Sequence, residues 1–157
     1  TAANTFTQNS VSLQTQGEAT NVVFEIFRIH VAVSGNTGFA DDDDMLAWGW
    51  YTGAATKTDR TQCDLSDSRV IHTDSMEIVD LGAASAFFLL WPNRSRMYDL
   101  ESKTGSGFLV AAPQINFWVQ GTSLAAATSM SCLMIGRYKR VSQAQFNRIF
   151  LQQVSGN

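Results

Sequence analysis

The chain has 157 residues, of which 45% are hydrophobic and 16% charged, and its net charge is −3. A chain of this length forms one domain with a sizeable core. Its small negative charge excludes a global field that would attract nucleic acid or an anionic membrane. The charged fraction of 16% is below the usual quarter. We therefore expect a surface rich in Ser and Thr, suited to contacts with neighbouring subunits.

The N-terminal third predicts an arm followed by strands. Residues 1–20 are polar and contain no Lys or Arg, which predicts an arm or an edge strand preceded by an arm. Residues 21–34 alternate strongly and predict the first long strand. This alternation places Val23, Phe27, Ile29, Val31 and Val33 on one face, interrupted by Glu25, and Phe24, Ile26, Arg28 and His30 on the other.

Four further strands are predicted before residue 113. Residues 45–52 carry Leu46, Trp48 and Trp50 on one face, and a long polar loop follows at 53–68. The other three strands are predicted at 69–80, where the alternation is imperfect, at 85–91, where Pro92 ends an apolar run, and at 107–112.

The last part of the chain predicts two strands and a helix. Residues 115–120 and 129–141 alternate and are joined by small residues, which predicts a hairpin-like pair. Ser142 and Gln145 then fit a capping box, and Phe146, Ile149 and Phe150 follow at helical spacing. We therefore expect a short amphipathic helix, with a last strand as the alternative.

Together these elements predict an all-β fold of about eight antiparallel strands: a sandwich, single jelly roll or barrel. We expect a polar arm or edge strand at 1–20, a β-sandwich domain at 21–141 and a C-terminal tail at 142–157.

One stretch resembles a catalytic motif. Residues 121–126, G-T-S-L-A-A, are similar to the nucleophile motif of subtilisin-like proteases, with Ser123 as the nucleophile. The closing proline of that motif is Ala127 here, and no Asp precedes His30, although that family orders its triad Asp, His, Ser. We therefore expect a connection between strands, and we predict no catalytic residues.

The acidic run at 41–44 and the two histidines are candidate metal ligands. The four consecutive carboxylates could supply oxygen ligands to Ca²⁺, but adjacent side chains cannot all face one ion; they are Asp41, Asp42, Asp43 and Asp44. We expect a solvated loop there, or a contact to Arg or Lys of another subunit. His30 and His72 fall on separate strands and are expected to be structural. No metal or cofactor is predicted.

The basic residues cluster near the C-terminus. Arg137, Lys139, Arg140 and Arg148 could meet phosphate. Strand alternation places Arg137 and Lys139 on one face and Arg140 on the other. This division weakens a single patch, so we expect surface or subunit-contact ion pairs.

The aromatic and thiol side chains are assigned to packing. Trp48, Trp50, Trp91 and Trp118 are expected in the core or an interface, with a sugar-binding platform as the alternative. Cys63 and Cys132 are expected to be free thiols, with one disulfide as the alternative. Residues 93–95 form a glycosylation sequon.

The closing pattern, S-M-S-C-L-M-I-G-R-Y-K-R-V-S-Q-A-Q-F-N-R-I-F at 129–150, resembles the last strand and tail of single jelly-roll capsid proteins of viruses and phages. Length, low charge, β-richness and the polar arm agree with this resemblance. One departure is that residues 1–17 lack the Arg-rich arm of capsid proteins that package nucleic acid directly. The resemblance then implies an inner face lying against a membrane or another protein layer.

The resemblance implies a structural protein of the virion that assembles with copies of itself and with other shell proteins, without catalysis, cofactor or small-molecule substrate. The alternative is a β-sandwich module that binds carbohydrate through Trp48 or Trp50 and the acidic loop. A hydrolase built on Ser123 is a third hypothesis.

Overall fold

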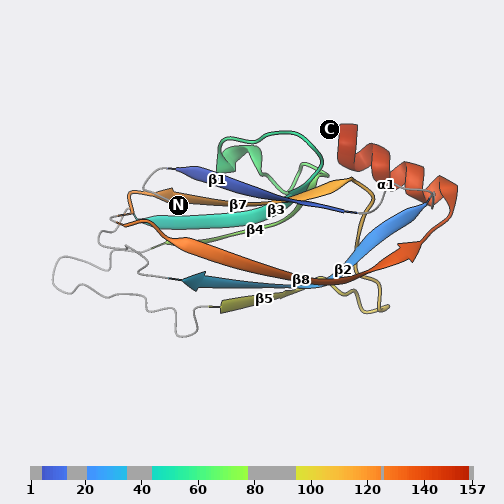
Figure 1. Cartoon of the computed structure of the whole chain (residues 1–157), viewed down its shortest axis with the longest axis horizontal. Helices are drawn as coiled ribbons and strands as arrows, with labels where there is room; N and C mark the ends of the chain where they lie inside the picture. The colour runs from blue at the N-terminus through green and yellow to red at the C-terminus, as the bar shows by residue number, and fades with distance from the viewer. Residues whose placement is uncertain (1–4, 14–20, 35–43, 78–94, 125, 156–157) are drawn as a thin grey trace.

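The computed structural model describes residues 5–13, 21–34, 44–77, 95–124 and 126–155, which form strands and one α-helix (Figure 1). The strand predicted at 85–91 lies outside these ranges. The elements are β1 (Phe6–Ser12), β2 (Val22–Ser34), β3 (Met45–Thr52), β4 (Val70–Glu77), β5 (Ser95–Asp99), β6 (Phe108–Val110), β7 (Gln114–Thr122), β8 (Ser129–Arg140) and α1 (Gln143–Ser155), with a 3₁₀ turn at Arg60–Gln62.

The strands form two antiparallel sheets that pack face to face, so the predicted all-β sandwich is confirmed. One sheet has the order β1-β7-β3-β4. The other is built around β2, whose residue Ile26 lies opposite Phe108 of β6 and Gly136 of β8. Farther along, Ile29 lies opposite Tyr98 of β5 and Met134 of β8. Hence β8 occupies one edge of β2, while β5 and β6 share the other.

The predicted hairpin of the last two strands is wrong. β7 pairs with β1 and β3, whereas β8 pairs with β2, so the chain crosses from one sheet to the other between residues 122 and 129. The small residues there mark a crossover. Alternation identifies strands, but it carries no information about which strands pair.

A β-bulge in β2 changes the predicted faces of that strand. Ile26 pairs with Gly136 and Arg28 with Ile135, so Phe27 is an extra residue relative to β8. The core side chains of β2 are therefore Phe24 and Ile26 before the bulge, and Ile29, Val31 and Val33 after it. The single apolar face that Glu25 was expected to interrupt does not exist, because a bulge reverses the alternation of a strand.

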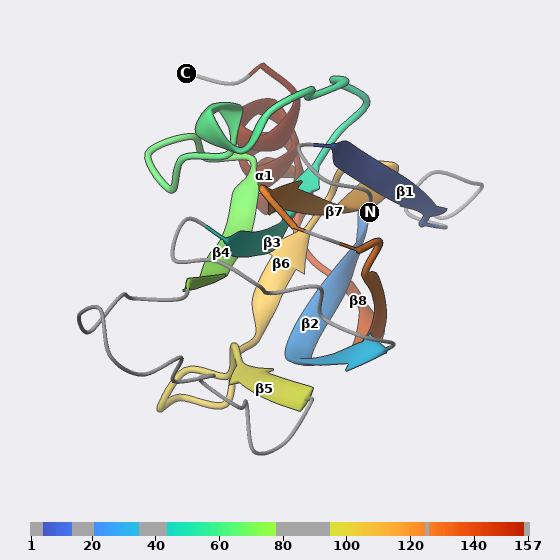
Figure 2. The same cartoon turned by 90° about the vertical axis from the view of Figure 1, so that its left-hand side faces the viewer.

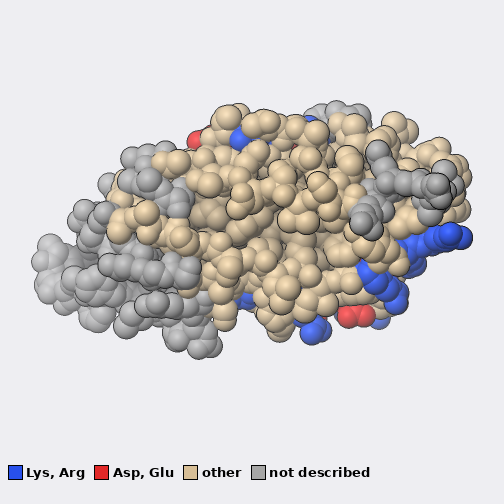
Figure 3. All heavy atoms as spheres, in the orientation of Figure 1, with Lys and Arg blue, Asp and Glu red and all other residues tan. Residues whose placement is uncertain are grey.

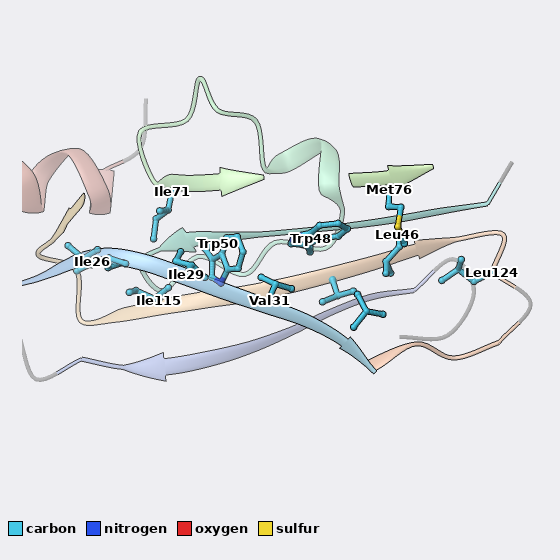
Figure 4. Packing of buried hydrophobic residues seen from close by; sticks show 14 residues of the cluster. Ile26, Ile29, Val31, Leu46, Trp48, Trp50, Ile71, Met76, Ile115 and Leu124 are labelled. Carbon is cyan, nitrogen blue, oxygen red and sulfur yellow. The ribbon is translucent and has the colours of Figure 1, made fainter. Parts of the chain in front are cut away.

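The core lies between the two sheets, and most of its buried side chains are aliphatic, with Trp48 and Trp50 as the largest (Figure 4). Trp48 and Trp50 of β3 are fully buried there, as their predicted shared face with Leu46 requires. The Trp50 ring stacks on Phe117 with 5.4 Å between centroids and meets the edge of Tyr98 at 5.5 Å. Such ring pairs add stability beyond the area they bury.

A smaller apolar cluster lies on the other face of the β1-β7-β3-β4 sheet. The loop between β3 and β4 covers it, and it contains Ala47, Tyr51, Cys63, Val70 and Trp118. Phe6 of β1 stacks on Trp118 with 5.5 Å between ring centroids. This sheet is thus covered on both faces.

The helix α1 closes one end of the sandwich (Figure 1). The backbone N–H of Gln145 donates to Ser142 Oγ at 3.2 Å, as the capping box predicts. Gln153 is buried and binds the backbone near β6. Its Oε1 accepts hydrogen bonds from Ala111 and Ala112 at 2.8 and 3.2 Å, and its Nε2 donates to Leu109 O at 2.8 Å. These bonds dock the helix on the sheet.

Substituting Gly136→Ala should destabilise the fold. A Cβ atom at this position would lie 2.5 Å from the carbonyl oxygen of Glu25 and 2.8 Å from Phe24 Cζ. Because neighbouring strands would have to separate, we expect the free energy of unfolding to fall by about 1–3 kcal/mol. Chemical denaturation would measure this change, with the exposed Ser131→Ala on the same strand as control. Equal stability of the two variants would contradict the close packing.

Candidate functional site

The carboxylate of Glu25 is buried beneath two cations of β8. Arg137 Nε donates to Glu25 Oε2 at 2.8 Å, and Lys139 Nζ donates to Oε1 at 3.3 Å. The backbone N–H of Gly107 also donates to Oε1, at 3.3 Å. The side chains of Arg137 and Lys139 remain 60% and 40% exposed, so they cover Glu25 while staying in contact with water. The predicted ion pairing of these two cations is therefore satisfied within the chain.

Glu25 is ionised at neutral pH. Burial raises the pKa of its carboxyl group, but the hydrogen bonds from Arg137 and Lys139 outweigh burial, and the net pKa lies below the ordinary value. A carboxylate whose pKa is lowered by folding stabilises the native state above its ordinary pKa. That contribution is lost as pH falls through the lowered pKa.

A second polar cluster ties the two sheets together at the β4–β5 side. Tyr98 Oη of β5 donates to Asp74 Oδ2 of β4 at 2.6 Å and accepts a hydrogen bond from Trp48 Nε1 at 3.0 Å. Arg96 also pairs with Asp74. Burial raises the pKa of Asp74, but the bonds from Tyr98 and Arg96 bring it below its ordinary value. No short stretch of the sequence reveals this network, because its members lie on three strands.

The two histidines occupy different places. The ring of His72 lies 4.3 Å from that of Tyr98 and 6.1 Å from that of Trp50. Burial lowers the pKa of His72, with a partly compensating effect of Asp74, which favours the neutral imidazole. His30 lies on the outer face of the other sheet, opposite Met97 and Leu133. The described residues contain no group of three His, Cys, Asp or Glu side chains that could hold a metal ion.

Ser123 lies just after β7, where the chain leaves one sheet for the other. It is exposed, and its φ of 56° places it in the left-handed region that turns use. The next side chain, Leu124, is buried in the core. The small-residue stretch thus serves as the crossover connection, with His30 and His72 placed on β2 and β4.

The acidic run is described only at its last residue. Asp44 is buried immediately before β3, so the expected solvated position is wrong for this side chain. It directly precedes Met45, which is paired on both sides, with Glu77 of β4 and Thr122 of β7, so the start of β3 lies inside the sheet. The other three aspartates lie outside the described residues, so the solvated loop or subunit contact expected there stays a prediction.

The three tryptophans that the structure describes do not form an exposed platform. Trp48 and Trp50 have no accessible surface and Trp118 almost none, so packing is confirmed for these three side chains. Stacking on a sugar requires an exposed ring face, which excludes Trp48 and Trp50 from the carbohydrate role considered above. Trp91 and the first two residues of the sequon lie outside the described residues.

Both cysteines are free thiols, as predicted. Burial raises the pKa of Cys63 to about 11. Cys132 Sγ accepts a hydrogen bond from Trp50 Nε1 at 3.1 Å, and burial raises its pKa as well. Since the thiolate is the nucleophile, both thiols are poorly reactive at neutral pH.

A mostly apolar groove of about 520 Å³ is lined by residues of β1 and β8. These strands lie on the side of the sandwich away from β4 and β5 (Figure 2). Its walls come from both sheets and include Val11, Phe24, Phe117, Met130 and Met134. The groove marks where the two sheets separate at these edge strands.

Exposed apolar side chains lie on the outer face of the β2 sheet. Leu133 and Ile135 of β8 are 61% and 44% exposed, and Met97 of β5 is 58% exposed. Leu133 and Met97 flank His30 in the same register. The sequence pattern separates two faces of this strand, because Leu133 and Ile135 alternate with Met130, Cys132 and Met134. It does not show which of the two faces water.

Comparisons with protein-family models, with curated proteins and with solved structures gave no match. Within the described ranges, no helix is long and apolar enough to cross a membrane.

The variant Glu25→Gln should lose stability in a pH-dependent way. At neutral pH we expect the free energy of unfolding to fall by about 1–3 kcal/mol, because charge-assisted hydrogen bonds to a buried group are lost. The difference in unfolding free energy between the two proteins should shrink below about pH 4. There Glu25 takes up a proton when the unmodified chain unfolds, so the ion cluster contributes less to stability. Urea titrations across pH would measure it, with exposed Glu77→Gln as control. A Glu25→Gln variant with unchanged stability at pH 7 would refute the role of this ion cluster.

Removing the hydroxyl group that joins the sheets should also destabilise the protein. Tyr98→Phe takes away the donor to Asp74 and the acceptor of Trp48, so we expect a loss of about 1–3 kcal/mol. Asp74→Asn should weaken the same bond, and the double variant should lose less than the two single losses added together. Denaturation of the three variants gives this coupling. Strict additivity would show that the two side chains do not act together.

Proposed function

We propose that this chain is a structural subunit that self-assembles into a viral, capsid-type shell through contacts between subunits. The observation that carries the proposal is the exposed apolar row on β8, Leu133 and Ile135, in a chain with only 16% charged residues. Single exposed apolar residues are common, whereas a contiguous exposed apolar patch marks an interaction site.

The buried ionisable groups support a scaffold role. Glu25 is held by Arg137 and Lys139, and Asp74 by Tyr98 and Arg96. In the loop over the smaller apolar cluster, Asp67 binds Lys57 at 3.0 Å and Arg69 at 2.8 Å. Each of these groups stabilises the fold through its partners, so the proposed role needs no chemical step.

The proposed partners are copies of this chain, other shell proteins and an underlying membrane or protein layer in the virion. Residues 1–17 contain no Lys or Arg, which argues against direct contact of this segment with the genome. In the view of Figure 3, Lys and Arg side chains gather at the end of the molecule where β8 meets α1 (Figure 1). Two cations at this end of β8, Arg137 and Lys139, share the single negative charge of Glu25.

The alternative is a binding module, and one feature favours it. A recess of about 530 Å³ lies at the loop that covers the β1-β7-β3-β4 sheet. Its lining includes the polar side chains of Arg60, Thr61, Thr73 and Ser75. Such a lining suits a small polar ligand such as a sugar. The ligand would be held by hydrogen bonds and not by ring stacking, because the nearby Trp118 ring is buried.

Self-association separates the two proposals. Sedimentation velocity and electron microscopy of the purified chain, from about 1 μM to about 1 mM, should show oligomers or shells whose population grows with concentration. A chain that remains monomeric throughout this range would contradict the shell proposal. A glycan panel tested by calorimetry should give no heat of binding; saturable binding abolished by Thr73→Val but not by the exposed Ser131→Ala would support the alternative.

A further inference from the structure

Within the part of the chain that the structure describes, strand β8 is a long edge strand. It spans 12 residues, and among the described strands only β2 pairs with it. Proteins usually protect such edges with charges, Pro, bulges or short length. Residues 129–136 contain no charged residue and no Pro, and the bulge in this ladder belongs to β2. The edge is therefore suited to pair with another extended strand.

The charge distribution of β8 selects the direction of that pairing. Its cations, Arg137, Lys139 and Arg140, all lie at the C-terminal end. In a parallel pair with a second copy, like cations would lie about 5 Å apart on neighbouring strands. In an antiparallel pair centred on Met134, Arg137 would lie about 20 Å from its counterpart, beyond the screening length of about 8 Å at physiological salt. The uncharged segments would then overlap.

The apolar side chains select the register. In an antiparallel pair related by a twofold axis normal to the sheet, opposite residues share a face, so the axis passes through a residue pair. An axis at Met134 places Leu133 beside Ile135 of the second copy, and Ile135 beside Leu133. An axis one residue away would place one of these apolar side chains beside Ser131 or Arg137. Apolar cross-strand pairs are the favourable ones.

We propose that two copies of this chain join through β8, as an antiparallel strand pair with its twofold axis at Met134, and that this pair is one of the contacts of the assembly. The inference rests on the proposed function and specifies one of its interfaces. The β2 sheets of the two copies become one continuous sheet. Leu133 and Ile135 of both copies form a small apolar cluster around the axis.

A matched pair of charge substitutions tests the surface. Leu133 and Met97 are equally exposed on the same sheet face, but only Leu133 lies at the proposed axis. Leu133→Lys should weaken the dimer by about tenfold or more, while Met97→Lys should leave it unchanged, as measured by sedimentation equilibrium. Equal loss in both variants would overturn the inference, since it would mean that a partner, such as a lipid surface or another protein, covers the whole face.

Cysteine cross-linking tests the register. Met134→Cys should form a disulfide between copies on mild oxidation, because directly opposite Cα atoms lie about 5 Å apart in an antiparallel pair. Ser131→Cys and the natural Cys132 should not, as their counterparts would lie about 20 and 14 Å away. If Met134→Cys fails to fold, mixing the single variants Leu133→Cys and Ile135→Cys gives the same test with exposed side chains. The proposed axis cross-links the two variants with each other, whereas an axis one residue away cross-links one of them with itself.

The outcomes separate this interface from self-assembly itself. A chain that assembles, but in which neither cysteine variant cross-links and Leu133→Lys behaves like the unmodified chain, would overturn the β8 contact and leave the shell proposal standing. A chain that is monomeric at every concentration would overturn both. Cross-linking at Cys132 in place of residue 134 would also refute the proposed axis.

Discussion

The extra residue in β2 determines which side chains of the second sheet face the core. Before the bulge, Phe24 and Ile26 point inward; after it, Ile29, Val31 and Val33 do. Without the bulge, Glu25 would share a face with Ile29, and a carboxylate would be placed in the apolar core at a large desolvation cost. With the bulge, Glu25 lies outside the core, where cations of β8 reach it.

The rest of the structure follows from how β2 is paired. Its ladder with β8 places Arg137 directly opposite Glu25, and its ladder with β5 places Tyr98 opposite Ile29, from which the hydroxyl reaches Asp74 of the other sheet. One polar cluster therefore fixes β8 on β2, and the other fixes the two sheets against each other. Directional bonds of this kind restrict the relative position of layers that apolar packing alone would allow to slide.

Local elements were predictable from the sequence, while their partners were not. Strong alternation located β3 to within a residue, and Ser142 with Gln145 located the start of α1, because both signals are local. The hairpin assigned to β7 and β8 was wrong because pairing depends on residues far away in the chain. Glu25 within an apolar alternation was a usable sign of the bulge. The Tyr98–Asp74–Trp48 bonds join three strands, so no sequence window contained them.

The pairing of β2 also has a consequence for biosynthesis. All three strands that flank it come later in the chain, and its first residue pairs with Arg140. During translation, β2 therefore emerges before any of its three ladders can form, and its ladder with β8 must wait until nearly the whole domain has left the ribosome. Folds dominated by such distant pairings form slowly and expose aggregation-prone segments meanwhile. Chaperone demand and the rate of synthesis would then control how many chains reach the native state.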